Sequence, residues 1–122
     1  MCSSDLKTSI DIVLHQILPA ACAYTTSLCN SVIAKKSVGA AHQAESQLIQ
    51  LLSSTTDSLF EKCENLKHLL DETPADPEKA TAYYAGEVIP AMESMRKDVD
   101  ILEANTDKSY WPYPVYSELL YY

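Results

Sequence analysis

Residues 48–70 read LIQLLSSTTDSLFEKCENLKHLL, and this stretch decides the fold. Apolar or small side chains recur in steps of three or four residues, which is the period of one face of an α-helix. Charged side chains fall mostly on the opposite face. The predicted apolar face consists of Leu48, Leu52, Thr55, Leu59, Cys63, Leu66 and Leu70, widened by Leu51, Phe60 and Leu69.

Two more stretches carry the same helical pattern, one on each side of a central helix predicted over about residues 41–72. The first runs over about residues 4–38, and Gly39 suits the left-handed turn that ends many helices. The third runs over about residues 77–105, with Asp76 as the capping residue before it. Their predicted apolar faces consist of Leu6, Ile10, Val13, Ile17, Ala21, Tyr24, Leu28 and Val32, and of Tyr84, Val88, Met92, Met95, Val99 and Leu102.

Short connections between three long helices favour antiparallel neighbours. We therefore expect an all-α fold, in which residues 1–122 form one helical domain, an up-down-up antiparallel bundle of three long helices. Two prolines lie inside these helices in similar contexts, I-L-P-A around Pro19 and I-P-A-M around Pro90. Because proline lacks the N–H of a helical hydrogen bond, we expect bends at Pro19 and Pro90; alternatively, each proline begins a new helix.

The chain ends in a segment with many aromatic residues. Residues 110–122 read YWPYPVYSELLYY and hold the only Trp and five of the eight Tyr. Two prolines favour extended backbone, so this segment is predicted to be a stiff aromatic strap with a short closing turn, packed on a preformed surface. The candidate docking residues of the strap are Trp111, Pro112, Tyr113, Pro114, Tyr116, Leu119 and Leu120.

Composition limits the kinds of partner. A net charge of −8 disfavours nucleic acid and anionic membranes, because both attract basic surfaces. No run of about 18 apolar residues is present, so no membrane span is expected, and the first residues do not read as a signal peptide. The cysteines are interpreted as small buried hydrophobic residues in a reducing compartment; they are Cys2, Cys22, Cys29 and Cys63.

The residue types that carry catalysis do not form a recognisable pattern. The three histidines lie on different helices or at helix ends, and no H-E-x-x-H motif is present. Glu64 and His68 are four residues apart, and a surface hydrogen bond between them is favoured over a metal site. Asp98 and Asp100 are interpreted as part of a solvated face. We expect no catalytic, cofactor-binding or metal-binding residue in this chain.

Three motifs resemble the C-terminal helical domain of type III glutamine synthetases. They are V-I-P-A-M-E at residues 88–93, D-x-L-E at 100–103 and W-P-x-P-x-Y-x-E-L-L at 111–120. The run Q-I-L-P-A at residues 16–20, followed by Tyr24, is similar to an earlier helix of the same region. The resemblance extends over nearly the whole chain, from about Ile10 to Tyr122.

The resemblance implies a fragment of a glutamate–ammonia ligase, an enzyme of nitrogen metabolism that uses ATP and Mg or Mn to join ammonia to glutamate. It implies that the catalytic barrel, with its ATP, glutamate and metal sites, lies outside these 122 residues. It also implies a cytoplasmic ring of many subunits. We therefore expect a non-catalytic domain that packs on the catalytic domain of the same enzyme, or that serves oligomerisation by contacts between subunits.

Two other interpretations stay open. The chain could be a free-standing helical-bundle interaction module that binds partner helices in its own groove, which a native start codon at Met1 would favour. It could also be a small bundle enzyme that uses His or Glu with a metal. The sequence favours the second of these least, because its histidines and carboxylates lack metal-ligand spacing.

Overall fold

The computed structural model describes residues 3–111, and all regular secondary structure in this part of the chain is helical. Two π-helical turns join α1 to α2 and α4 to α5 without a break, so three long helical stretches result. The prediction of an all-α chain with three long helices is confirmed for these residues. The elements are α1 (Ser3–Ile12), η1 (Val13–Ile17), α2 (Leu18–Ser37), α3 (Gln43–Asp71), α4 (Pro77–Tyr83), η2 (Tyr84–Val88) and α5 (Ile89–Asn105).

A π-helical turn precedes each of the two prolines inside the helices. The N–H of the residue before the proline donates to the carbonyl five residues back, as Leu18 does to Val13. Pro19 and Pro90 are the second residues of the α-helical segments that follow, and neither can donate a hydrogen bond. The wider turn thus accommodates a proline while the helix continues. The sequence analysis missed these turns, and the bends at Pro19 and Pro90 stay predictions.

Local sequence sets two helix ends as predicted. Gly39 has a φ of +73°, and its N–H donates to the Lys36 carbonyl at 3.2 Å. The next N–H reaches back to the Lys35 carbonyl at 2.8 Å, which completes a Schellman motif at the end of α2. The Asp76 carboxylate accepts a hydrogen bond from the Lys79 N–H at 3.1 Å and caps α4.

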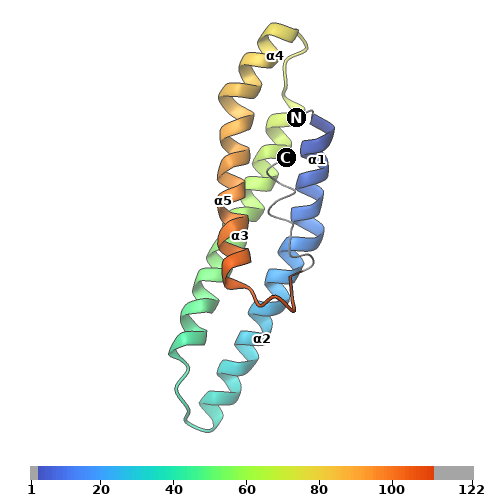
Figure 1. The fold of residues 1–122 in the computed structure, drawn as a ribbon. Helices are drawn as coiled ribbons and strands as arrows, with labels where there is room; N and C mark the ends of the chain where they lie inside the picture. Colours follow the sequence, from blue (N-terminus) through green and yellow to red (C-terminus); the bar gives the residue numbers. More distant parts are fainter. Residues whose placement is uncertain (1–2, 112–122) are drawn as a thin grey trace.

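Helix α3 lies between the other two helical stretches and contacts both of them (Figure 1). Ser58 of α3 binds Asp98 of α5, whereas Leu69, farther along α3, accepts a hydrogen bond from Tyr83 of α4. The numbers rise along α3 as they fall along its partner, so the two stretches run in opposite directions. The loop at residues 38–42 reverses the chain between α2 and α3.

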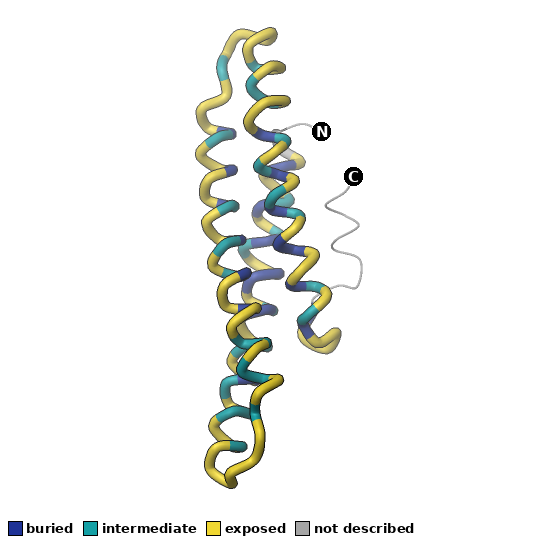
Figure 2. Tube along the Cα trace, turned by 90° about the vertical axis from the view of Figure 1, so that its left-hand side faces the viewer, coloured by how far each residue is buried: buried dark blue, intermediate teal, exposed yellow. Residues whose placement is uncertain are grey.

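The apolar core lies where the three stretches run together. Figure 2 shows the buried residues concentrated there and absent near the loop between α2 and α3. Most residues of the predicted apolar faces are buried, but Tyr24, Val32, Leu48 and Tyr84 are half-buried. The prediction of burial was less accurate for the three residues added to the apolar face of the central helix. Leu69 is half-buried, whereas Leu51 and Phe60 are exposed.

The hairpin of α2 and α3 extends beyond the end of α5 (Figures 1 and 2). Helix α5 ends at Asn105, and no residue from 29 to 51 is buried, although this range holds the last turns of α2 and the first turns of α3. We call residues 29–51 the arm. We call residues 3–28 and 52–105 the three-helix region. The two regions share helices but differ in what covers them.

Candidate functional site

A buried ion pair connects α3 to α5 in the three-helix region. The Asp98 side chain belongs to a residue that is 7% exposed, and it accepts a hydrogen bond from Ser58 Oγ at 2.8 Å. The Lys62 Nζ lies 3.0 Å from the same Asp98 oxygen and also donates to the Ser94 carbonyl at 3.4 Å. The carboxylate is therefore matched by two donors from α3.

The interpretation of Asp98 as part of a solvated face is wrong. Asp98 lies three residues after Met95 and four before Leu102, which are both buried, so helical periodicity already placed it at the edge of the core. A buried pair of this kind fixes how two helices align more than it adds net stability. Because its charge is already neutralised by Lys62, Asp98 is a structural residue and not a free acid or base.

Cys63 lies beside this ion pair and is buried. Its Sγ lies 3.7 Å from Met95 Sδ, and burial, with a smaller contribution from Glu64, raises the pKa of the thiol to about 12. The thiolate is the reactive form of cysteine, so Cys63 is inert near neutral pH. The interpretation of the cysteines as buried hydrophobic residues therefore suits Cys63, but it is wrong for Cys22, which is exposed.

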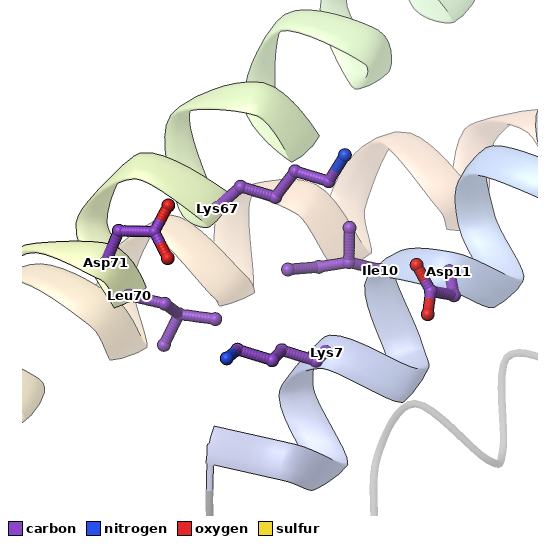
Figure 3. Close-up of a pocket in the computed structure, with 6 residues that line it drawn as sticks. All are labelled: Lys7, Ile10, Asp11, Lys67, Leu70 and Asp71. Carbon is purple, nitrogen blue, oxygen red and sulfur yellow. The ribbon is translucent and has the colours of Figure 1, made fainter.

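A pocket of about 290 Å³ lies between α1 and the C-terminal end of α3 (Figure 3). Two apolar side chains form its wall, and a lysine extends over it from each of the two helices. Its charged residues are two lysines and two aspartates, and no histidine, cysteine or serine lines it. Its lining residues are Lys7, Ile10, Asp11, Lys67, Leu70 and Asp71.

A second, mostly apolar depression of about 470 Å³ lies where α2 begins and packs on α3. Phe60 projects there as an exposed aromatic side chain. Its polar residues are one histidine, the exposed Cys22, a threonine and two carboxylates. The depression is lined by Leu14, His15, Leu18, Pro19, Cys22, Thr56, Asp57, Phe60 and Glu64.

The expected hydrogen bond between Glu64 and His68 is replaced by other pairs. The Nε2 of His68 lies 3.1 Å from a Glu72 carboxylate oxygen, and Glu64 pairs with Lys67 at 3.6 Å. All four side chains are well exposed, so these pairs contribute little to stability. Within residues 3–111, no group of three or more His, Cys, Asp or Glu side chains is placed to hold a metal ion.

The first residues of the predicted strap pack against the three-helix region. The ring of Tyr110 lies 5.3 Å from the ring of Tyr24, measured between centroids, and Trp111 is 8% exposed and belongs to the apolar core. The rest of the strap, including its closing turn, lies outside the described residues. The candidate docking residues in that part are Pro112, Tyr113, Pro114, Tyr116, Leu119 and Leu120.

Two buried polar atoms near the end of α5 have no hydrogen-bond partner within residues 3–111. They are Thr106 Oγ1 and Trp111 Nε1, on residues that are 6% and 8% exposed. Buried polar atoms are nearly always paired, and each unpaired one costs about 1–3 kcal/mol. The end of α5 therefore carries two polar atoms whose burial is not offset by a hydrogen bond within residues 3–111.

The helical stretch Asp5–Ser37 is long and apolar enough, by length and composition, to cross a membrane, which the sequence analysis did not expect. A core helix of a globular protein passes the same test, and so does a signal sequence near the N-terminus, so this evidence is weak. The informative part is the exposure, since 17% of the apolar window is buried. From residue 16 to residue 34 the chain has no Asp, Glu, Lys or Arg, so α2 presents an uncharged surface as far as Ala34, before Lys35 and Lys36 in its last turn.

Comparison with known proteins relates the chain to one enzyme. A glutamine synthetase from Bacteroides fragilis (strain YCH46) is 28% identical to this chain over 120 residues. The match covers 91% of this chain, which spans 16% of the length of that protein. No family model matches the chain, and no solved structure matches it. The chain is thus similar to a fragment of a glutamine synthetase.

Proposed function

We propose that this chain is a non-catalytic part of a glutamine synthetase and corresponds to the C-terminal helical domain of the type III enzymes. The observation that carries the proposal is the 28% identity to a glutamine synthetase across 91% of the chain. The V-I-P-A-M-E and W-P-x-P-x-Y-x-E-L-L motifs favour the type III enzymes and the C-terminal position. The parent reaction is then the ATP-dependent ligation of ammonia to glutamate.

The chemistry of the described residues supports a non-catalytic role. Asp98 is neutralised by Lys62, and burial raises the pKa of the Cys63 thiol to about 12. We therefore assign the ATP, glutamate and Mg or Mn sites to the remainder of the parent enzyme, which we place in the cytoplasm as a ring of subunits.

The role we propose for this domain is docking on the catalytic domain of the same enzyme or contact between subunits. The exposed surface of α2, uncharged as far as Ala34, supports a protein contact, because charged residues are depleted in the centres of protein interfaces. The buried Trp111 supports a strap that begins on the three-helix region.

The genomic DNA upstream of the Met1 codon tests the proposal first. An in-frame sequence encoding a glutamine synthetase catalytic domain is the expected result. A stop codon with an independent promoter would contradict it, and would favour a free-standing interaction module.

Deletion of the region equivalent to residues 1–122 tests the role of the domain. The complete enzyme, expressed with and without this region, is compared by the mass of its assembly and by its rate of glutamine formation. We expect the shortened enzyme to lose the native assembly. Normal assembly and turnover would contradict a role in docking or oligomerisation.

A free-standing interaction module is the second candidate function, and one observation favours it. The mostly apolar depression at the start of α2, with Phe60 exposed beside it, could receive an apolar side chain of a partner helix. Capture experiments become informative only if the upstream DNA lacks a catalytic domain.

A further inference from the structure

Helix α5 covers only part of α3. Ser58 faces α5, because its Oγ binds Asp98 at 2.8 Å. Leu51 and Ala44 lie one and two heptads before Ser58, so they share approximately this side of α3. Helix α5 ends at Asn105, about 10 Å of helix beyond Asp98 and near the level of Leu51. The side of α3 that α5 covers therefore continues, uncovered, into the arm.

The arm has a smaller share of charged residues than the chain as a whole. Its 23 residues, 29–51, contain three charged side chains, whereas charged residues make up 21% of the whole chain. Two of the three, Lys35 and Glu45, pair with each other, and the hydrogen bond from Lys35 lowers the pKa of Glu45. Leu51 is 39% exposed, and no arm residue is buried. An exposed surface with so few charges is typical of a protein interface.

The arm begins next to a part of the core that holds two unpaired polar atoms. Tyr110 packs on Tyr24, one helical turn before Leu28, which is the last buried residue of α2. In this part of the structure the buried atoms Thr106 Oγ1 and Trp111 Nε1 lack hydrogen-bond partners within residues 3–111.

We propose that the arm is a docking site for another segment of the same polypeptide, which lies along the line of α5 on Ala44, Leu48 and Leu51. This inference rests on the proposed function, since the related glutamine synthetase is far longer and this chain spans 16% of it. Most of such a polypeptide is available to cover the arm. We expect the docked segment to present an uncharged, apolar helix face. A charged face would lose its hydration on binding and would gain no charge partner from Ala44, Leu48 or Leu51.

A lipid surface fits the arm less well than a protein segment does. The α3 side of the arm carries Gln43, Gln47 and Gln50, all exposed, and unpaired amides are costly in hydrocarbon. The net charge of −8 also opposes binding to anionic lipid.

Hydrogen exchange measured by mass spectrometry tests the proposal. The amides of residues 29–51 are compared between this 122-residue chain and the complete natural polypeptide. We expect exchange at least tenfold slower in the complete polypeptide. The double variant Ala44→Glu and Leu51→Glu should restore fast exchange, because it places two carboxylates on the docking face. The matched control is Ile101→Glu, on α5 outside the arm, since Ile101 is 38% exposed and Leu51 is 39% exposed.

Several outcomes would overturn the proposal. These are equal exchange of the arm in both proteins, slow exchange that the double variant leaves unchanged, and protection of the 122-residue chain by self-association or by phosphatidylcholine–phosphatidylglycerol vesicles. If deleting the whole region disrupts assembly while the arm amides stay unprotected, the inference fails and the proposed function stands. If the upstream DNA encodes no further domain, both fail together.

Discussion

The three-helix region and the arm contain parts of the same two helices, but different contacts hold them. In the three-helix region, α3 is covered on both sides, and Leu52, Leu59 and Leu66 are fully buried. In the arm, no helix of residues 3–111 other than α2 and α3 covers the hairpin, and contacts such as the Lys35–Glu45 pair lie near the surface. Full burial of side chains in this hairpin therefore depends on packing by a third helix and not on helix propensity.

The comparison also shows where specificity lies. The polar contacts between α3 and α5 involve the buried carboxylate of Asp98. Few alternative alignments of the two helices would keep this carboxylate paired. The arm offers a surface with few charges, on which we propose that another segment of the same polypeptide docks. Stability should therefore depend on the three-helix region, and assembly on the arm. Substitutions in the two regions should therefore differ in their cost to stability.

Removal of the Asp98 carboxylate should have the largest effect. In Asp98→Ala, Ser58 and the partly exposed Lys62 lose their hydrogen bonds to a charged acceptor, and we expect a loss of about 2–5 kcal/mol in the free energy of unfolding. Urea denaturation followed by circular dichroism measures it. Asp57→Ala, at an exposed position of the same helix, is the control and should change stability by less than about 0.5 kcal/mol. Equal effects of the two variants would contradict a structural role for Asp98.

Truncation of leucines on α3 compares the two regions directly. Leu59→Ala removes a fully buried side chain and should cost about 2–5 kcal/mol. Leu48→Ala removes a half-buried side chain from the arm, where the cavity is open to water, and should cost about 1 kcal/mol or less. If Leu48→Ala costs as much as Leu59→Ala in urea denaturation, the arm has a core of its own.

The Cys63 thiol should make stability depend on pH in the alkaline range. Burial raises its pKa from 9.0 to about 12 in the folded chain, so the unfolded chain releases this proton first as the pH rises. The free energy of unfolding should therefore fall between pH 9 and 12, by at most about 1.4 kcal/mol per pH unit from this group. Urea denaturation of Cys63→Ala, compared with the unchanged chain, should give a shallower slope. An unchanged slope would show that this thiol ionises freely in the folded chain.

The two glycines should respond in opposite directions to alanine. Gly39 has a φ of +73°, so Gly39→Ala should destabilise the turn of the arm by about 1 kcal/mol. Gly86 lies in a helical stretch with nothing within 4 Å of an added Cβ, so Gly86→Ala should stabilise by about 0.5–1 kcal/mol. Thermal unfolding of both variants measures this difference. A gain in stability for Gly39→Ala would contradict the left-handed turn.

The sequence predicted the helices well because their signals are local. Apolar spacing located all three stretches, and Gly39 and Asp76 marked ends that the structure confirms. Where Val32 and Leu48 were expected to be buried, they are half-buried, because the pattern of one helix does not reveal where its neighbour ends. The extent of α5 relative to the hairpin is a property of three segments together.

The polar features were harder to predict, for related reasons. Asp98 was assigned to a solvated face because its charge outweighed its position beside Val99, and only its partners on α3 explain its burial. The π-helical turns before Pro19 and Pro90 were missed because proline was expected to break or bend a helix. An extra residue in the turn is a third way to accommodate it.

Hydrogen exchange of the 122-residue chain, followed residue by residue with NMR, tests the division between the two regions most directly. We predict that amides of α3 around Leu59 and Leu66 exchange only through global unfolding, and that amides of residues 43–51 in the same helix exchange at least a hundredfold faster through local opening. Uniform protection along α3 would contradict the account, because the arm would then be stable without a third helix.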